Sequence, residues 1–227
     1  TLVEENGRRG LHDFEYELLD TGVFAENRYF DVVVEYAKAA ENDILIQISL
    51  TNRGPETAEC YLLPTLWYRN TWSWGYAAGP MGDVPGRPVI KQIDGSRGVL
   101  AVQADHPAQG RYYLYAEQAA EMLFTENDTN VSRLFGGTNH SPYVKDAFHR
   151  YLIEGETDAV NPAKTGTKVA ALYQNSLAPG ETRTLRLRLS DSSQPAPFKG
   201  FANIFKKRIT EADEFYRAIQ PAGLNQE

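Results

Sequence analysis

The sequence predicts an all-β fold, an antiparallel sandwich followed by a single helix at the C-terminal end. Apolar and polar residues alternate at positions 44–51, with the period of two that is typical of a half-buried strand. Short strand-like runs recur through the middle of the 227 residues, separated by links that contain Gly or Pro. No helical segments alternate with these runs, which favours an antiparallel sandwich over a parallel βαβ sheet.

The first strands are predicted from alternation and from turn residues. Residues 30–36 place one set of apolar and aromatic side chains on one face, and residues 44–51 form the next strand. The link at 39–43 contains Glu-Asn-Asp and is predicted to be a hairpin connection. A second turn at 52–55, Asn-Arg-Gly-Pro, leads into a strand predicted over residues 59–68.

Further short strands are predicted at 99–103, 111–116, 121–124, 145–153 and 168–174. Pro179-Gly180 then turns the chain into a last strand at 182–189. The leucines of this strand are predicted to face the core, and its arginines, Arg183, Arg186 and Arg188, to form a solvated face.

The pattern changes after Ser190. Residues 191–197 form a Ser/Pro-rich linker, and residues 198–220 repeat apolar side chains every three to four positions, as an amphipathic helix does. Pro221 ends the helix, because the residue before a proline avoids the helical region. We therefore expect a sandwich domain at 1–190 and a linker and helix at 191–227.

Composition excludes several classes of partner. The net charge is −7 and the longest basic run has three residues, which disfavours nucleic-acid binding. No apolar stretch is long enough to span a bilayer, so we expect no membrane partner and a cytoplasmic location. Cys60 is the single cysteine, and no CxxC, HxH or HExxH motif is present, so we expect no metal and no other cofactor.

All three tryptophans lie within residues 62–75. One is in a predicted strand, while Trp72 and Trp74 follow in a loop rich in Asn, Thr, Ser and Gly. Flat rings beside the donors of Arg69 and Asn70 match the C–H faces and hydroxyls of a sugar. Packing in a core or between domains is the alternative for these rings.

Two long loops, at 127–142 and 155–167, are further candidates, since long loops inside a compact β domain tend to be functional. The second loop offers Asp158, Asn161 and Lys164 but lacks the GxxxxGK[ST] pattern of a phosphate cradle. Two interpretations of this loop therefore remain open: it contacts a sugar or a neighbouring domain, or it is a surface loop without a binding role.

Acid–base candidates are less specific. His140 and His149 flank Asp146, and a mutarotase-like sugar epimerase needs one or two histidines and a carboxylate in one groove. Glycoside hydrolysis needs a pair of carboxylates, but 30 Asp and Glu residues give no pair that stands out. Such an epimerase remains an alternative function at this stage.

Six segments in the same order resemble a known family. They are LLDTGVF at 18–24, RYFDVVVEYAKA at 28–39, ILIQISLTNRGPE at 44–56, LPTLWYRNTWSWG at 63–75, SPYVKDAF at 141–148 and TDAVNPAKTGTK at 157–168. The chain resembles, from about residue 18 to residue 221, the N-terminal region of bacterial proteins related to glycoside hydrolase family 63. This is the processing α-glucosidase family, with its mannosylglycerate-hydrolase-like relatives.

The resemblance implies a galactose-mutarotase-like β-super-sandwich, then a linker helix, then an (α/α)₆ barrel. In that family the barrel carries the general acid and the general base of an inverting glycosidase. This chain ends at Glu227, where the barrel is expected to begin, and further sequence is expected upstream. The resemblance therefore assigns no catalytic residue to this chain and implies that the isolated chain is inactive.

The implied partner is the catalytic barrel of the same full-length protein, with an oligo- or disaccharide in the pocket that the sandwich borders. Self-association through the barrel-facing surface is a further expectation. A free-standing carbohydrate-binding module is the alternative to a barrel-supporting domain. The candidates for the substrate rim or domain interface are Arg69, Asn70, Trp72, Trp74, Asp158, Asn161 and Lys164.

Overall fold

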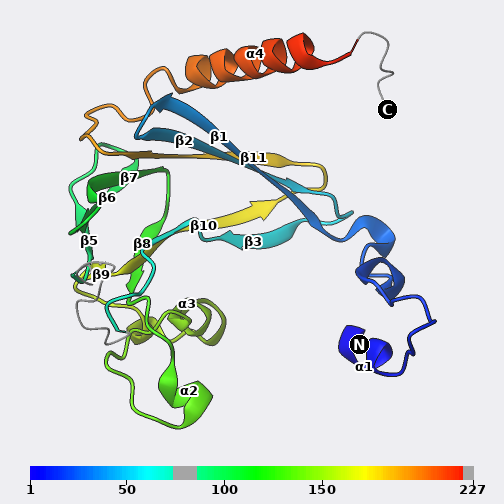
Figure 1. The fold of residues 1–227 in the computed structure, drawn as a ribbon. Helices are drawn as coiled ribbons and strands as arrows, with labels where there is room; N and C mark the ends of the chain where they lie inside the picture. The colour runs from blue at the N-terminus through cyan, green and yellow to red at the C-terminus, as the bar shows by residue number, and fades with distance from the viewer. Residues whose placement is uncertain (74–85, 222–227) are drawn as a thin grey trace. The chain divides into compact units, whose positions relative to one another are not determined.

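The computed structural model describes residues 1–73 and 86–221 (Figure 1). Its regular structure is mostly strand, and the strands pair in antiparallel sheets. This confirms the predicted all-β, sandwich-like fold with one long helix at the C-terminal end. The strands are β1 (Phe30–Ala40), β2 (Asp43–Asn52), β3 (Ala58–Leu62), β4 (Thr65–Trp67), β5 (Val89–Ile93), β6 (Val99–His106), β7 (Gly110–Glu117), β8 (Glu121–Thr125), β9 (Thr165–Gly166), β10 (Lys168–Leu177) and β11 (Thr182–Ser190).

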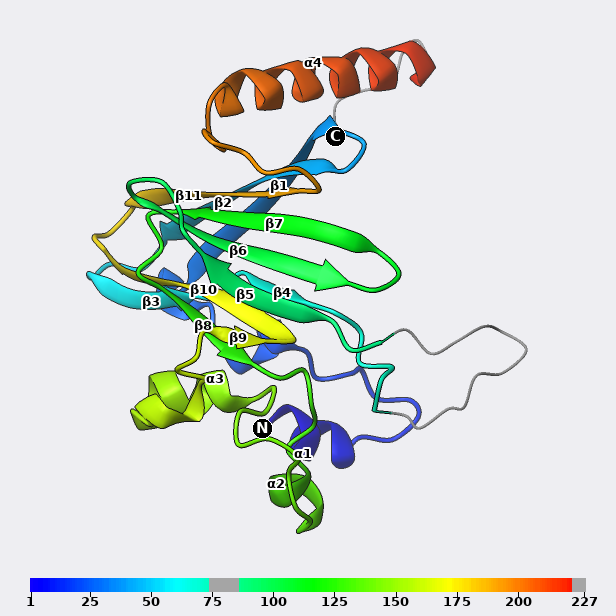
Figure 2. The ribbon, with the colours of Figure 1, turned by 90° about the vertical axis from the view of Figure 1, so that its left-hand side faces the viewer.

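The strands form two sheets (Figure 2). The larger sheet has the order β1-β2-β11-β7-β6-β5-β9. The smaller sheet has the order β3-β10-β4, and β8 also pairs with β10. Strand β8 therefore lies beside the longest strand of the smaller sheet, in the register Lys168↔Thr125 to Leu172↔Glu121.

The chain divides into two compact units. The first comprises Thr1–Val34, Ile48–Cys60 and Asn175–Thr184. Besides parts of β1–β3, it holds α1 (Leu2–Gly7) and two 3₁₀ turns, Leu18–Thr21 and Ala25–Asn27.

The predicted turn at 52–55 is confirmed in this first unit, and Asn52 organises it. The Asn52 Nδ2 donates to the carbonyls of Glu56 (2.7 Å) and Leu177 (2.9 Å), while its Oδ1 accepts from the N–H of Gly54 (2.8 Å). A Cβ on Gly54 would lie 3.0 Å from that Oδ1, which favours glycine at this position.

The second unit comprises Glu35–Gln47, Tyr61–Gln174 and Leu185–Glu227. Its core is built by apolar side chains of β5–β8 and β10, and residues without exposed surface include Ile90, Val102, Ala116, Phe124 and Val169. The long helix α4 (Phe201–Ile219) packs on the larger sheet, with Phe201 and Phe205 against Ala37 and Leu45. Burial of these alternating faces is what stabilises the sandwich.

The strand predicted over 59–68 is two strands, β3 and β4, interrupted at Leu63-Pro64. Proline has no N–H to donate to a strand ladder, so the pairing breaks there. The Pro64 carbonyl nevertheless accepts from the N–H of Ala171 at 3.0 Å, which keeps this segment beside β10.

The strand predicted over 145–153 is wrong. These residues form α3 (Ala147–His149) and a π-helical turn, Arg150–Glu154, which ends at the left-handed Gly155 (φ 73°). The apolar or aromatic side chains at 144, 147, 148, 151 and 152 are all buried or half-buried, which is helical spacing. Phe148 and Leu152 from this face pack against Leu123 of β8.

The predicted solvated arginine face of β11 is wrong for one residue. Arg188 is 8% exposed and forms a buried ion pair with Asp43 at the start of β2, with 2.8 Å between Nε and Oδ1. Its Nη1 also donates to the carbonyl of Pro197 at 2.8 Å. The linker therefore covers this end of β11 and binds its arginine.

The predicted C-terminal helix is confirmed, with a later start. Gly200 precedes it in the left-handed region (φ 72°), so the helix begins at Phe201 instead of residue 198. Gln220 is extended (ψ 128°) before Pro221, as the sequence predicts. No helix in residues 1–73 and 86–221 is long and apolar enough to cross a membrane.

Candidate functional site

Three loops meet where β8 ends and form a polar hollow of about 380 Å³. They follow β4, follow β8 and precede α3. The hollow is lined mostly by amide, hydroxyl, imidazole and charged groups, from Asn70, Ser73, Asn127, Asp128, Thr129, Val131, His140 and Lys145. Groups of this kind donate to and accept from a polyhydroxyl ligand.

Asn70 joins the tryptophan loop to the loop after β8. Its Nδ2 donates to the carbonyl of Asn127 (3.0 Å) and to Asp128 Oδ1 (2.6 Å). Its Oδ1 accepts from the N–H (3.2 Å) and the hydroxyl (2.8 Å) of Ser73. One side chain therefore fixes the positions of both loops.

Asn127 anchors the same loops to the sheets below. Its Nδ2 donates to the carbonyl of Tyr68 (2.9 Å), and its N–H donates to Thr167 Oγ1 (2.7 Å). Burial, together with the negative charge of Asp105, raises the pKa of Tyr68 to about 12. The Tyr68 hydroxyl stays protonated and donates to the carbonyl of Ala104 (3.4 Å).

The short helix α2 (Val131–Phe135) shapes the far wall of the hollow. Asn130 is buried and caps this helix, because its Oδ1 accepts from the N–H of Arg133 (3.1 Å). The same Oδ1 accepts from Asn139 Nδ2 (3.1 Å), two residues before Ser141 begins the segment that leads to α3. The loop 127–142 is thus organised by its own amides.

Two lysines place positive charge beside the hollow. Lys145 Nζ donates to Thr129 Oγ1 (3.1 Å), and Lys168 Nζ donates to the carbonyl of Lys145 (2.7 Å). Lys168 also lies over the Phe148 ring, with 4.8 Å from Nζ to the ring centroid. Burial, reinforced by the charge of Lys145, lowers the pKa of Lys168.

Of the predicted tryptophan-loop residues, Asn70 lies in the hollow. Its chain neighbour Arg69 is exposed, and Trp72 is half-buried. Trp74 lies outside the described residues. The tryptophan loop therefore contacts the loop after β8 through Asn70. The roles of Arg69 and Trp72 stay predictions.

The predicted residues of the second loop contact β8 at different points: the N–H of Asn161 donates to the carbonyl of Phe124 (2.8 Å), while Lys164 reaches Glu121 at the start of the strand. Asn161 closes a tight turn, in which its Oδ1 accepts from Ala163 N–H (3.0 Å) and its Nδ2 donates to the Thr165 carbonyl (2.7 Å). Asp158 is exposed in a 3₁₀ turn, Thr157–Ala159. These side chains do not line the hollow around Asn70.

Lys164 forms a small ionic cluster with two residues that the sequence does not single out. Its Nζ donates to Glu121 Oε1 (2.5 Å), and the Tyr151 hydroxyl donates to Glu121 Oε2 (2.8 Å). Burial opposes ionisation of Glu121, but the hydrogen bonds from Lys164 and Tyr151 outweigh it, so the pKa of this carboxyl is lowered. The cluster ties the second loop and the turn after α3 to β8.

Of the two histidines considered for an epimerase, His140 lies in the hollow and His149 does not. His140 lines the hollow, which also holds the Asp128 carboxylate. His149 is exposed at the end of α3. Asp146, which lies between them in sequence, pairs with Arg133 (3.2 Å).

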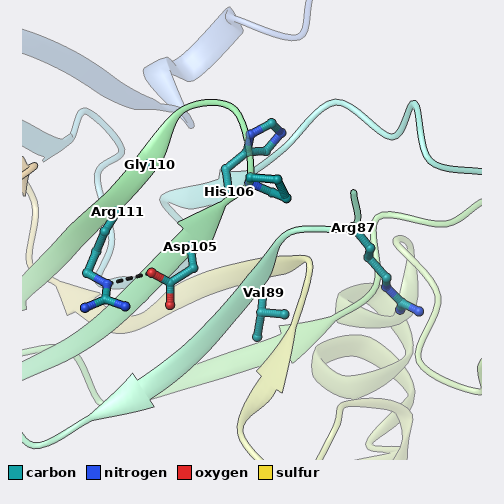
Figure 3. Close-up of a pocket in the computed structure, with 7 residues that line it drawn as sticks. Arg87, Val89, Asp105, His106, Gly110 and Arg111 are labelled. Carbon is teal, nitrogen blue, oxygen red and sulfur yellow. Dashed lines mark hydrogen bonds and ion pairs between the residues drawn. The ribbon is translucent and has the colours of Figure 1, made fainter. Parts of the chain in front are cut away.

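A second hollow, of about 510 Å³, lies at the tip of the β6–β7 hairpin (Figure 3). Asp105 and Arg111 point toward one another and form an ion pair of 2.6 Å, while Arg87 lies apart and pairs with Glu126 (2.7 Å). His106 Nδ1 accepts from two backbone N–H groups of the hairpin turn (3.1 and 3.2 Å). These charged groups do not converge on one point, so the hollow around Asn70 is the stronger candidate.

Sequence reasoning named Asn70 and His140 but missed Asp128, Thr129 and Lys145. The signal available for Asp128 was its place in the long loop 127–142. Within the described ranges, no group of three or more His, Cys, Asp or Glu side chains is placed to hold a metal ion.

Comparisons with known proteins find similarity to parts of two longer proteins. No family profile matches the sequence. The chain is 31% identical over 266 residues to a Saccharomyces cerevisiae protein named Uncharacterized protein YMR196W, with all of this chain aligned. It spans 24% of the length of that relative. Among solved structures it is similar to a polysaccharide lyase, BACCELL_00875, with a TM-score of 0.40 and 11% identity, over 71% of this chain and 20% of the lyase.

Proposed function

We propose that this chain is a non-catalytic sandwich domain of a glycoside hydrolase family 63-like protein, and that its Asn70 hollow borders the saccharide pocket of a catalytic (α/α)₆ barrel. The sandwich would comprise residues 1–190, and residues 191–227 would connect it to the barrel. The full-length protein would act in the cytoplasm.

The observation that carries this proposal is the joining of the tryptophan loop to the loop after β8 through Asn70. Asn70 makes two hydrogen bonds to the loop after β8 and accepts two from Ser73 in its own loop, and the hollow beside it is lined by eight described residues, most of them polar. An open surface with pre-placed amide and hydroxyl groups suits the rim of a sugar site. The order of the six family-like segments in the sequence supports the same assignment.

The chemistry of the hollow supports a non-catalytic role. Glycoside hydrolysis needs two carboxyl groups, about 5–5.5 Å apart in retaining enzymes and about 6.5–9.5 Å apart in inverting ones. Among the described residues that line the hollow, Asp128 is the one carboxylate, and its Oδ1 already accepts from Asn70. The acid–base pair would therefore come from the barrel.

A saccharide titration followed by amide NMR tests this proposal. With maltose, isomaltose, glucosylglycerate and mannosylglycerate, we expect shifts at residues 70–73 and 127–131 and weak, about millimolar, binding, because half of the site is missing. Asn70→Ala should abolish these shifts. Asn161→Ala, which removes an equivalent amide from the other loop, is the matched control and should leave them unchanged. Shifts confined to residues away from the hollow would contradict the proposal.

A free-standing carbohydrate-binding module is the second candidate, favoured by the half-buried Trp72, which lies in sequence between Asn70 and Ser73 of the hollow. It predicts binding at least about a hundredfold tighter than millimolar, because such a module carries its complete site. Trp72→Ala would then remove most of the affinity, through lost ring stacking on the sugar. Weak binding that survives Trp72→Ala would exclude this alternative.

A further inference from the structure

Three consecutive residues after β8 fasten two separate segments of the second unit. Arg87 lies just before β5, and its Nη2 donates to Glu126 Oε2 (2.7 Å). Asn70 of the tryptophan loop donates to the Asn127 carbonyl (3.0 Å) and to Asp128 Oδ1 (2.6 Å). The backbone of these three residues therefore determines where the polar groups of the Asn70 hollow lie.

The hydroxyl of Thr167 connects Glu126 to Asn127. Its Oγ1 donates to Glu126 Oε2 (2.8 Å) and accepts from the backbone N–H of Asn127 (2.7 Å). Thr167 is 1% exposed and the Glu126 side chain 13%, so water has little access to replace either partner. The N–H of Thr167 also donates to the Thr125 carbonyl (3.1 Å), which holds the threonine beside the end of β8.

The carboxylate of Glu126 determines which way this hydroxyl points. A carboxylate accepts hydrogen bonds and donates none, so Thr167 uses its one hydroxyl proton on Glu126. The lone pairs of the same oxygen then face the N–H of Asn127. Each group donates to the next, in the order Asn70, Asn127, Thr167 and Glu126. Hydrogen bonds aligned in this way strengthen one another.

We propose that Glu126 is the positioning residue of the Asn70 hollow, and that it acts through the hydroxyl of Thr167. Neither residue is among the described residues that line the hollow, so the effect of both on a ligand is indirect. The consequence for a saccharide rests on the proposed function. The Asn127 carbonyl and the Asn70 amide are held in one arrangement before the sugar arrives, so binding requires less ordering of these groups.

Amide hydrogen exchange of the unliganded 227-residue chain, followed by NMR, tests the positioning role. Glu126→Met removes the acceptor, which frees the Thr167 hydroxyl to rotate. Thr167→Val removes the hydroxyl at nearly constant volume. In both variants the N–H of Asn127 should exchange about tenfold faster relative to Leu114 in the middle of β7, whose exchange reports global unfolding.

The double variant Glu126→Met/Thr167→Val tests whether Glu126 acts through Thr167. It should exchange at Asn127 no faster than Thr167→Val alone, because the hydroxyl that connects the two residues is already gone. Thr167→Ser keeps the hydroxyl and should keep the protection. Thr165→Val is the matched control: the Thr165 hydroxyl donates to the Ile90 carbonyl (3.1 Å), and its loss should leave the relative exchange at Asn127 unchanged.

Saccharide titration of the same variants separates this inference from the proposed function. Glu126→Met and Thr167→Val should weaken binding about fivefold, whereas Thr165→Val should not. Faster exchange at Asn127 in a chain that binds no saccharide would contradict the proposed function and support the positioning role.

Two results would overturn the positioning role, whatever the saccharide does. One is exchange at Asn127 that Glu126→Met leaves unchanged, and the other is a full additive increase in the double variant. Should Thr167→Val not fold, as judged by circular dichroism, the comparison of Glu126→Met with Thr165→Val decides.

Discussion

Arg188 shows how one side chain connects three parts of the second unit. From its place in β11, its guanidinium donates to the carboxylate of Asp43 at the start of β2 and to the carbonyl of Pro197 in the linker. Both charged side chains are about nine-tenths buried. A buried carboxylate that loses its partner is left with an uncompensated charge.

Arg188→Ala should therefore lower the free energy of unfolding by about 3–5 kcal/mol, measured by urea denaturation. The control is Arg53→Ala, which removes an exposed pair with Asp31 and should cost at most about 1 kcal/mol. Equal losses for the two variants would mean that burial of the Arg188 pair contributes nothing.

Glu121 gives the fold a predictable response to acid. Its pKa in the folded state lies below the ordinary value of 4.5, since Lys164 and Tyr151 favour the ionised carboxylate despite its partial burial. The stabilisation is complete above pH 4.5 and is lost as the pH falls from there through the lowered pKa. Stability should thus fall with acid partly because of this one group.

Glu121→Gln should flatten the decline in urea midpoint between about pH 6 and about pH 3. Lys164→Met removes the main partner of the carboxylate and should flatten it in the same way. If the pH profiles of both variants match that of the unchanged chain, the Glu121 cluster does not stabilise the fold.

Single residues differed in how far the sequence could place them. Asn70 was predictable because its neighbours are aromatic and polar loop residues. Arg188 was not, since it occupies an Arg-Leu alternation that is indistinguishable from that of Arg186. Its burial depends on Asp43, which lies 145 residues away in sequence. Local pattern carries no information about such a contact.

At the scale of elements, the docked first turns of α4 should contribute far more to stability than the exposed end of α2. Phe205 is 7% exposed against the sheet, so Phe205→Ala should cost about 3–5 kcal/mol of unfolding free energy. Phe135 of α2 is 76% exposed, and Phe135→Ala should change stability by less than about 0.5 kcal/mol. Similar losses, measured by thermal or urea unfolding, would show that α4 is not docked on the sheet through its first turns.

Helices and strands whose apolar residues repeat with one clear period were predictable, and segments that fit both a helical and a strand period were not. The sequence of β11 alternates Leu with Arg, β2 keeps the alternation over Gln47–Thr51, and α4 repeats apolar residues every three to four positions. Residues 144–152 also carry helical spacing, but five apolar or aromatic residues in so short a segment resemble a strand equally well. Pro64 was a visible signal for the break between β3 and β4.

At the scale of the whole molecule, fold class followed from composition and period, because both act along the entire chain. The candidate hollow could not be predicted in this way, because loops that are distant in sequence converge on it. Their convergence depends on contacts such as those of the Asn70 amide with Asn127 and Asp128. The yeast relative is a longer protein, of which this chain spans 24%.

The rate of sugar release by the purified 227-residue chain tests the central claim most directly. The substrates are α-glucosides, glucosylglycerate and mannosylglycerate, with a buffer blank and a denatured sample as controls. We predict no release above the blank, because the described residues that line the hollow include one carboxylate, Asp128, where hydrolysis needs two. Release that copurifies with the chain and disappears in Asp128→Asn would contradict the account and place the catalytic site on this domain.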